Sequence, residues 1–241
     1  MLWIALNFQC LPLDSFPQAS AAAEPWAVTD GPRVLVCNPQ ARARGIRAGM
    51  SLSAACALAP TLSYRARDPA VEAAALDQIA AWAGQFTPSV SLQPPCGLVL
   101  EIDGSLGLLG GMQPILATIR RGTAGMGYAH TLACAPTAAA AWLLARADSE
   151  KIITCPRMIE AGIAPLPLAA LDCGEQTLEI LEAIGARTIG DVLRLPRAGL
   201  ARRCGQRLLD LLDRALGTLP EARKFYAPAP SFSAELERFL K

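Results

Sequence analysis

The order in which short extended segments alternate with helical segments constrains the fold of this 241-residue chain more than any other feature. Short apolar runs bounded by Pro, Gly and polar residues predict strands, and longer stretches with apolar residues at helical spacing predict helices. The predicted strands cover residues 2–9, 33–37, 62–65, 89–93, 98–102, 128–133 and 152–154. The predicted helices between them cover residues 51–58, 69–86, a stretch ending near 121, and 137–147. After residue 167 the pattern becomes purely helical, with segments at 177–184, 188–195 and 206–216.

Local signals at the ends of these segments support this order. Ser51 suits the N-cap of the helix that follows it, and Asp68-Pro69 opens the longer helix. Pro94-Pro95 marks the turn of a hairpin in a sheet core. From the first strand through the long helix and the hairpin, the order is β-α-β-β-α-β with an insertion after the first strand. The sequence therefore predicts an α+β, ferredoxin-like unit followed by an all-helical region.

Composition excludes several classes of protein. The formal net charge is +1, so any contact with nucleic acid has to come from local clusters of basic residues. Eight cysteines include no Cys-x-x-Cys pair, and His130 is the single histidine, which predicts free thiols and no metal or other cofactor. The apolar N-terminus lacks a basic leader, and no apolar run reaches the roughly 18 residues of a membrane span. We expect a cytoplasmic protein without membrane contact.

Four segments, in the same order along the chain, resemble motifs of the Y-family (translesion) DNA polymerases. Residues 2–11 resemble the opening strand of the polymerase palm, where an Asp-x-Asp pair holds metal, but Asn7 and Gln9 stand at those positions. Residues 38–50 resemble the fingers motif, in which Arg42 matches the arginine that binds the nucleotide triphosphate. Pro39 replaces the tyrosine of that motif.

The other two segments depart from the family at its charged positions. Residues 94–102 resemble the strand that carries an Asp-Glu pair, which is replaced here by Cys96 and Gly97, so that only Glu101 stays acidic. Residues 131–141 resemble the entry of a helix whose phosphate-contacting lysine is replaced by Ala138. Pro12 stands in place of the aromatic residue near the sugar.

These replacements remove the chemistry that the resemblance implies. Two-metal phosphoryl transfer needs several carboxylates to hold two Mg²⁺ ions about 3.5–4 Å apart. An amide brings no negative charge, a thiol is too soft for Mg²⁺, and glycine offers no side chain. Asp14, Glu101 and Asp103 lie off the matched positions. We therefore predict that the chain has no metal site in the palm and is not an active enzyme.

The helical region resembles the polymerase thumb, which contains a helix-hairpin-helix that binds DNA phosphates through backbone N–H groups. Residues 170–175 stand where the family has a Pro-Gly-x-Gly-Lys hairpin, and residues 185–192 follow the family closely. Asp172 and Glu175 place negative charge where a phosphate would lie, and nearby arginines can compensate. The residues predicted to contact DNA are Gly174, Arg187, Gly190, Arg202 and Arg203.

The resemblance also implies a division of the chain. Residues 1–19 and 71–164 are predicted to be palm-like, residues 20–70 fingers-like, and residues 165–222 a thumb. Residues 223–241 are predicted to be a linker and the start of a truncated little finger, because Pro228 and Pro230 precede an alternating pattern at 232–240.

Within the family, the missing carboxylates resemble the ImuB branch of degenerate polymerase homologues. That resemblance implies a non-catalytic scaffold of translesion DNA synthesis and mutagenesis, acting in DNA repair during the SOS response to DNA damage. The implied partners are DNA, an error-prone C-family DNA polymerase, a RecA-like mutagenesis accessory protein and the sliding clamp, whose binding peptide is not evident in this chain. Two alternatives stay open: an active translesion polymerase with an altered metal site, and a simple helix-hairpin-helix DNA-binding module.

Overall fold

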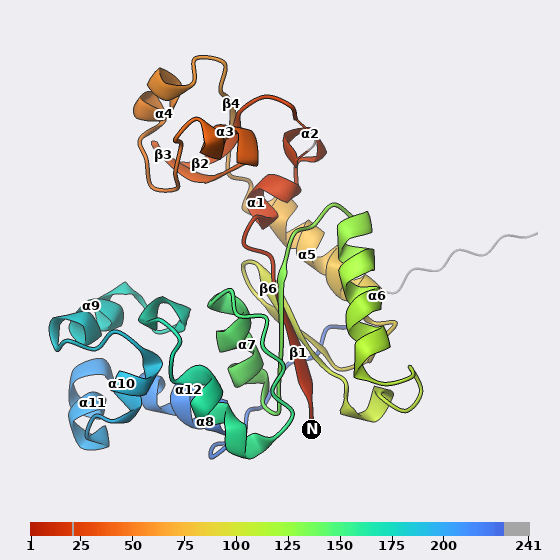
Figure 1. Cartoon of the computed structure of the whole chain (residues 1–241), viewed down its shortest axis with the longest axis vertical. Helices are drawn as coiled ribbons and strands as arrows, with labels where there is room; N and C mark the ends of the chain where they lie inside the picture. Colours follow the sequence, from red (N-terminus) through yellow and green to blue (C-terminus); the bar gives the residue numbers. More distant parts are fainter. Residues whose placement is uncertain (21, 229–241) are drawn as a thin grey trace, which may run out of the picture.

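The computed structural model describes residues 1–20 and 22–228 and centres on a four-stranded antiparallel sheet. Its strands are β1 (Trp3–Asn7), β5 (Val90–Gln93), β6 (Gly97–Glu101) and β7 (Thr131–Ala135), in the order β5-β6-β1-β7. The helices α5 (Pro69–Ala83) and α6 (Met112–Gly125) cover one face, and α7 (Ala138–Arg146) covers the other (Figure 1). The series β1-α5-β5-β6-α6-β7 confirms the predicted β-α-β-β-α-β order.

Alternation along β1 explains why both faces of this sheet are covered. Ile4 and Leu6 pack with α5 and α6, whereas Trp3 and Ala5 pack with α7 and the helices that follow it. All five residues of β1 are buried. A strand buried on both faces reads as a continuous apolar run, which is what the N-terminal sequence contains.

Capping residues set where the helices begin. The side chain of Asp68 accepts hydrogen bonds from the backbone N–H groups of Ala70 and Val71, and Ser51 caps α4 (Leu52–Leu58) through Ala54. Both N-caps were predicted from the sequence and are confirmed. Thr137 caps α7 in the same way through Ala140.

A second, smaller sheet lies at one end of the molecule (Figure 1). Its strands are β2 (Trp26–Asp30), β3 (Arg33–Cys37) and β4 (Ser63–Ala66), in the order β3-β2-β4. The short helices around it are α1 (Leu11–Asp14), α2 (Pro17–Ser20), α3 (Pro39–Ala43) and α4. We call residues 11–66 of the described chain the small-sheet unit.

The C-terminal part of the described chain is helical and packs on α7. Its elements are η2 (Pro156–Met158), α8 (Ile159–Ile163), η3 (Leu168–Ala170), α9 (Glu175–Ala183), α10 (Ile189–Leu193), α11 (Arg197–Cys204) and α12 (Gln206–Leu216). Together with α7 and one face of the central sheet, these helices form a continuous apolar core. The remaining element, η1 (Asp103–Ser105), is a turn of 3₁₀-helix after β6.

Several predicted boundaries are wrong. The first strand ends at Asn7, so Gln9 lies in the turn after it, and the last palm strand covers 131–135 where 128–133 was predicted. Segment 152–154 forms only a single bridge, from Ile152 to Cys134. Strand β2 was missed because five residues within a Pro-, Ala- and Ser-rich stretch give no clear alternation. The pattern at 232–240 lies outside the described residues.

The predicted division of the chain into palm-like, fingers-like and thumb regions, at residues 19, 70, 164 and 222, stays a prediction.

Among the described residues, no helix is both long enough and apolar enough to cross a membrane.

Candidate functional site

Three of the four positions at which the sequence predicts lost carboxylates lie together at one end of β1 and β6. Asn7 is the last residue of β1 and lies opposite Gly97 in the antiparallel ladder, and it is only 4% exposed. The backbone N–H of Phe8 donates to the carbonyl of Cys96 at 2.7 Å, which holds Cys96 beside them. Gln9, the fourth position, does not lie with them. It is in the turn after β1, where it is exposed to solvent.

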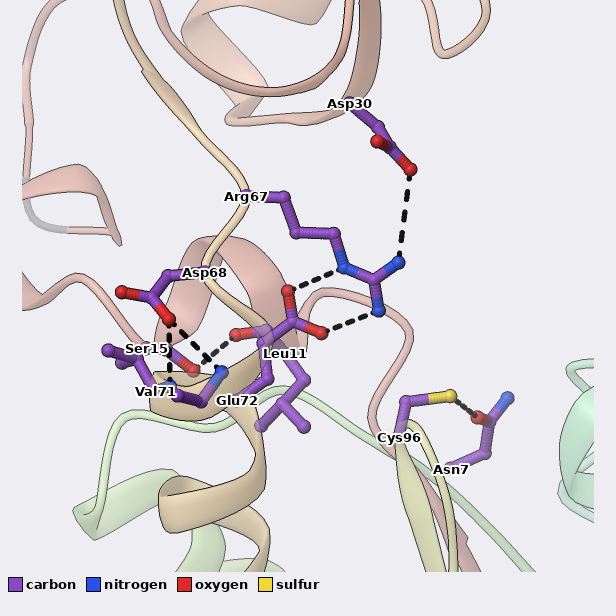
Figure 2. A network of polar contacts seen from close by, with 10 residues as sticks. Asn7, Leu11, Ser15, Asp30, Arg67, Asp68, Val71, Glu72 and Cys96 are labelled. Atoms are coloured by element: carbon purple, nitrogen blue, oxygen red, sulfur yellow. Dashed lines mark hydrogen bonds and ion pairs between the residues drawn. The ribbon is translucent and has the colours of Figure 1, made fainter.

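The side-chain amide of Asn7 is bonded at both ends within the protein. Its Nδ2 donates to the carbonyl of Ala145 in α7 at 3.3 Å. Its Oδ1 accepts from the Sγ of Cys96 at 3.4 Å, a contact drawn in Figure 2. Burial raises the pKa of the Cys96 thiol, which keeps the proton that it donates to Asn7. An amide held in this way has no free oxygen aimed at a ligand, and a protonated thiol is a poor ligand for a hard cation.

The ring of Trp142 fills the space above Gly97. A Cβ built on Gly97 would lie 2.2 Å from two carbon atoms of that ring and 2.8 Å from the carbonyl oxygen of Leu6. Contacts this short are forbidden, so no side chain fits at position 97 unless the ring moves. Trp142 is itself 8% exposed and belongs to the core between α7 and the C-terminal helices. An aromatic ring therefore occupies the space that a side chain at position 97, a predicted metal-binding position, would need.

The other nearby carboxylates do not gather at this place. Glu101 lies opposite Trp3, four residues along β6 from Gly97, which is about 13 Å at the rise of a strand. Asp14 accepts a hydrogen bond from the backbone N–H of Ala129, and burial raises its pKa. Among the described residues, no group of three His, Cys, Asp or Glu side chains is placed to hold a metal ion. An amide, a thiol and a glycine do not fit two Mg²⁺ ions.

An ion pair next to this site joins the small-sheet unit to α5. Arg67 donates from Nε and Nη2 to the two carboxylate oxygens of Glu72, both at 2.8 Å, and its Nη1 lies 3.9 Å from Asp30 (Figure 2). The Glu72 side chain is 5% exposed. The hydrogen bond to Glu72 is the main cause that raises the pKa of Arg67. From its place directly after β4, the Arg67 guanidinium thus links Asp30 of β2 to Glu72 of α5.

Arg42 lies in the last turn of α3, on the exposed surface of the small-sheet unit. Within the described part of the chain its side chain makes no hydrogen bond or ion pair, whereas Arg47 donates to the backbone carbonyls of Arg42 and Ile46. Arg47 therefore braces the loop after α3, and Arg42 keeps a free charge. Its predicted role in binding a nucleotide stays a prediction.

Two glycines with positive φ begin helices that face a common cavity. Gly174, with φ 82°, precedes α9, and Gly205, with φ 81°, precedes α12. The cavity has a volume of about 610 Å³, and its walls include Trp142, Gly174 and Arg207. Gly174 is exposed, and its predicted contact with DNA stays a prediction. Arg207 is one of the arginines expected to compensate for the charges of Asp172 and Glu175, whereas Gly205 was not singled out, although the Cys-Gly dipeptide before each helix repeats in the sequence.

The remaining residues predicted to contact DNA fall into two groups. Arg187, Arg202 and Arg203 are exposed, and the N–H of Arg187 donates to the Asp191 carboxylate. Gly190 instead is buried; its N–H donates to the Ala164 carbonyl at 2.8 Å, and a Cβ there would lie 3.0 Å from that oxygen. The prediction for Gly190 is corrected to helix packing, because its N–H is not free for a phosphate.

The charge of Asp172 is partly compensated within the protein. Its carboxylate lies 3.2 Å from Nη1 of Arg146 at the end of α7, a residue that the sequence did not single out. The electrostatic repulsion expected between Asp172 and a phosphate is therefore reduced.

Most of the chain is similar in sequence to known proteins. The profile of the impB/mucB/samB family matches residues 17–146. Protein ImuB from two strains of Caulobacter vibrioides is 38% identical over 195 residues, which is 81% of this chain and 43% of each relative. The chain therefore spans less than half the length of these curated relatives.

Solved structures of Y-family polymerases share the fold. DinB from Sulfolobus solfataricus matches with a TM-score of 0.69 and 18% identity over 93% of this chain and 70% of that one. A Dbh-Dpo4 chimera of a Y-family DNA polymerase matches with a TM-score of 0.72 and 17% identity over 94% of this chain and 70% of the chimera. A ternary complex of Dbh matches with a TM-score of 0.69 and 18% identity over 93% and 69%. The chain belongs to the impB/mucB/samB family and has the fold of the Y-family DNA polymerases.

Proposed function

We propose that this protein is a non-catalytic, DNA-binding scaffold of bacterial translesion DNA synthesis and damage-induced mutagenesis. The observation that carries the proposal is the filled palm site, where Asn7 is bonded at both ends and Trp142 covers Gly97. Polymerisation depends on anions that neutralise two metal ions, and an amide and an aromatic ring supply none. The same positions still serve the fold, because they pack β1, β6 and α7 together.

Manganese binding tests the loss of the metal site. The whole chain, with primer-template DNA and a nucleotide, is titrated with Mn²⁺ and followed by electron paramagnetic resonance. We expect the spectrum of free Mn²⁺ plus whatever the nucleotide alone binds, because no set of carboxylates replaces the water shell of the ion. An active Dbh polymerase is the positive control. Bound Mn²⁺ that requires both this protein and DNA would contradict the proposal.

The arginines of the helical region support binding to the DNA backbone. Within the described residues, the side chains of Arg203 and Arg207 make no hydrogen bond or ion pair, whereas Arg197 is paired with Asp213. Free guanidinium groups beside exposed helix N-termini neutralise phosphates and release counterions, so the affinity falls with salt.

Fluorescence anisotropy with labelled duplex DNA over a range of salt concentrations measures this contribution. Arg203→Ala is expected to weaken binding and to lower the slope of log affinity against log salt by about one. Arg197→Ala serves as the control, since its charge is already paired. Equal losses in the two variants, or no binding by the unaltered chain, would contradict DNA binding by this surface.

The recruitment of an error-prone C-family polymerase, a RecA-like accessory protein and the sliding clamp rests on the resemblance to the ImuB branch. Because the chain spans 43% of those relatives, the partners are best tested with the chain and with Protein ImuB from Caulobacter vibrioides in parallel. We expect sedimentation velocity to give a complex for ImuB. If neither protein binds any of the three partners, the scaffold role is wrong even where DNA binding persists.

A further inference from the structure

The central sheet has a free edge beyond β7. The N–H of Cys134 donates to the carbonyl of Lys151 at 3.0 Å, and the N–H of Ile153 donates to the carbonyl of Cys134 at 2.9 Å. Segment 151–153 therefore runs parallel to β7 and uses the polar groups of Lys151 and Ile153 on its inner side. Because these groups alternate along an extended chain, the N–H and carbonyl of Ile152 point away from the sheet.

The outward groups have no backbone partner in the part of the chain that the structure describes. Neither the N–H nor the carbonyl of Ile152 takes part in a hydrogen bond, and the N–H of Thr154 does not either. Unpaired strand edges are templates for another strand. The segment thus offers at least one donor and one acceptor in the arrangement that an added strand needs.

Packing fixes this edge in an extended conformation. The Ile153 side chain is 8% exposed and rests on the bare backbone of α8, where a Cβ on Gly162 would lie 2.2 Å from the Ile153 Cδ1. The close approach holds segment 151–154 against α8. A partner would therefore meet a preformed edge and would not have to order it.

An apolar groove runs beside the free edge. It has a volume of about 410 Å³ and is lined by residues 151–155 together with Met158, Ala161 and Gly162. Ile152 is 39% exposed and Met158 is 56% exposed, although both are large apolar side chains. The volume matches a few side chains of a bound peptide.

Charge decides which partner suits the groove. Among the described residues that line it, Lys151 alone is charged, and the exposed Arg157 precedes Met158. Neither side chain has an ion pair within the described chain, and the acidic Glu160 of α8 is not part of the lining. Two copies of this chain paired edge to edge would bring like charges together, which disfavours a dimer.

We propose that this edge and groove bind an extended segment of another protein that carries both apolar and acidic residues. The segment adds a strand outside Ile152, where backbone hydrogen bonds provide affinity. Its apolar side chains enter the groove beside Met158, and its acidic side chains lie next to Lys151 and Arg157 at the border of the groove. The proposed binding site lies at the edge of the sheet opposite to β5. The proposal therefore does not depend on whether the palm incorporates nucleotides.

Amide chemical shifts test the proposal with a defined probe. The ¹⁵N-labelled whole chain is titrated with a blocked octapeptide of four Glu-Val repeats and, separately, with one of four Lys-Val repeats. We expect saturable shifts of the Ile152 and Thr154 amides with the acidic peptide, at a Kd below about 1 mM, and binding at least tenfold weaker with the basic peptide.

Two variants separate the edge from the groove. Ile152→Pro removes an N–H that the fold does not use, and Met158→Glu places an acid on an exposed side chain in the groove. Each is expected to weaken binding of the acidic peptide at least tenfold, whereas Leu108→Glu, at a position that is 88% exposed and outside the groove, should leave it unchanged.

Three results would overturn the proposal. The first is the absence of saturable shifts at Ile152 and Thr154, and the second is equal binding of the two peptides. The third is self-association of the chain that Ile152→Pro abolishes, which would assign the edge to a second copy. Met158→Glu keeps the test valid if Ile152→Pro unfolds, because Met158 contributes little to the core.

Discussion

At the scale of single residues, the palm site is closed by contacts that each stabilise the fold. The Asn7 amide satisfies two partners at once, a thiol and a helix carbonyl, and buried polar groups with full hydrogen bonding stabilise a unique arrangement. Trp142 then packs where the backbone is bare at Gly97. Restoring one acid would therefore break existing contacts before it could bind a metal ion.

Asn7→Asp is expected to lower the free energy of unfolding by about 1–3 kcal/mol, since a buried carboxylate cannot donate to the Ala145 carbonyl and places its negative charge against that oxygen. Urea denaturation at neutral pH measures the change. Gln9→Glu is the matched control, because Gln9 is exposed and should change stability by less than about 0.5 kcal/mol. Equal effects of the two substitutions would show that Asn7 is not bonded as described.

Gly97→Ala tests the contact with Trp142. The added Cβ would overlap the ring, so we expect a loss of about 1–3 kcal/mol in the free energy of unfolding. In the double variant with Trp142→Ala, the combined loss should be smaller than the sum of the two single losses. Gly199→Ala, which meets nothing within 4 Å inside α11, should be neutral or stabilising. Additive losses would argue against the packing of Trp142 on Gly97.

His130, the single histidine, provides a clean reporter of pH. Burial beside the Phe8 ring, at 5.7 Å between centroids, lowers its pKa below the ordinary value of about 6.5. Because the pKa of His130 is lower in the folded chain than in the unfolded chain, the unfolded chain binds the proton more tightly. The free energy of unfolding should therefore decrease as the pH drops from about 6.5 through the lower pKa of the folded chain. NMR titration of the ring checks the direction, and His130→Gln should flatten this part of the stability profile. A midpoint above 6.5 would contradict the described packing.

At the scale of elements, the sequence predicted most of the central sheet and little of the detail around it. The caps at Ser51 and Asp68 and the apolar runs of β1 and β6 are local signals, and the structure confirms them. Strand β2 is held between β3, which follows it directly, and β4, which is distant in sequence, and its five residues alone gave no recognisable pattern.

The sequence predicted only part of the candidate site, because the rest depends on how elements distant in sequence pack together. Motif positions singled out Asn7, Cys96 and Gly97, and the antiparallel pairing of β1 with β6 brings them together. Trp142 could not be found from spacing, since its place above Gly97 depends on how α7 packs across the sheet. Gly190 was assigned to DNA for its position in a motif, whereas its close contact with Ala164 is a tertiary feature.

The ion pair of Arg67 with Glu72 is expected to hold the small-sheet unit against α5. Arg67→Met leaves the Glu72 carboxylate buried without its cation and should cost about 3 kcal/mol, the lower end for buried pairs because Arg67 is 27% exposed. Arg120→Met is the control, since its pair with Glu150 is exposed and should contribute at most about 1 kcal/mol. Hydrogen exchange should show faster exchange in β2 and β4 of Arg67→Met than in β1. Uniform exchange changes would contradict a role at this junction.

At the scale of the whole molecule, the chain has the fold of a Y-family polymerase, and an amide, a thiol and a glycine stand at positions predicted to have lost their metal-binding acids. The central sheet, α7 and the C-terminal helices share one core, so the residues that fill the palm also connect it to the helical region. Within the described residues, exposed arginines without side-chain partners lie on that helical region, and a free sheet edge lies beyond β7. The proposed scaffold would use these surfaces to bind DNA and another protein and would leave synthesis to a partner.

Primer extension at protein excess, on undamaged and lesion-containing templates with Mg²⁺ or Mn²⁺, tests the central claim most directly. Anisotropy in the same samples shows that the DNA is bound. We predict that no primer gains a nucleotide while the DNA stays bound to the protein. Incorporation that follows this chain through purification, and that Glu101→Gln or Asp103→Asn abolishes, would contradict the account and place a working metal site elsewhere in the palm.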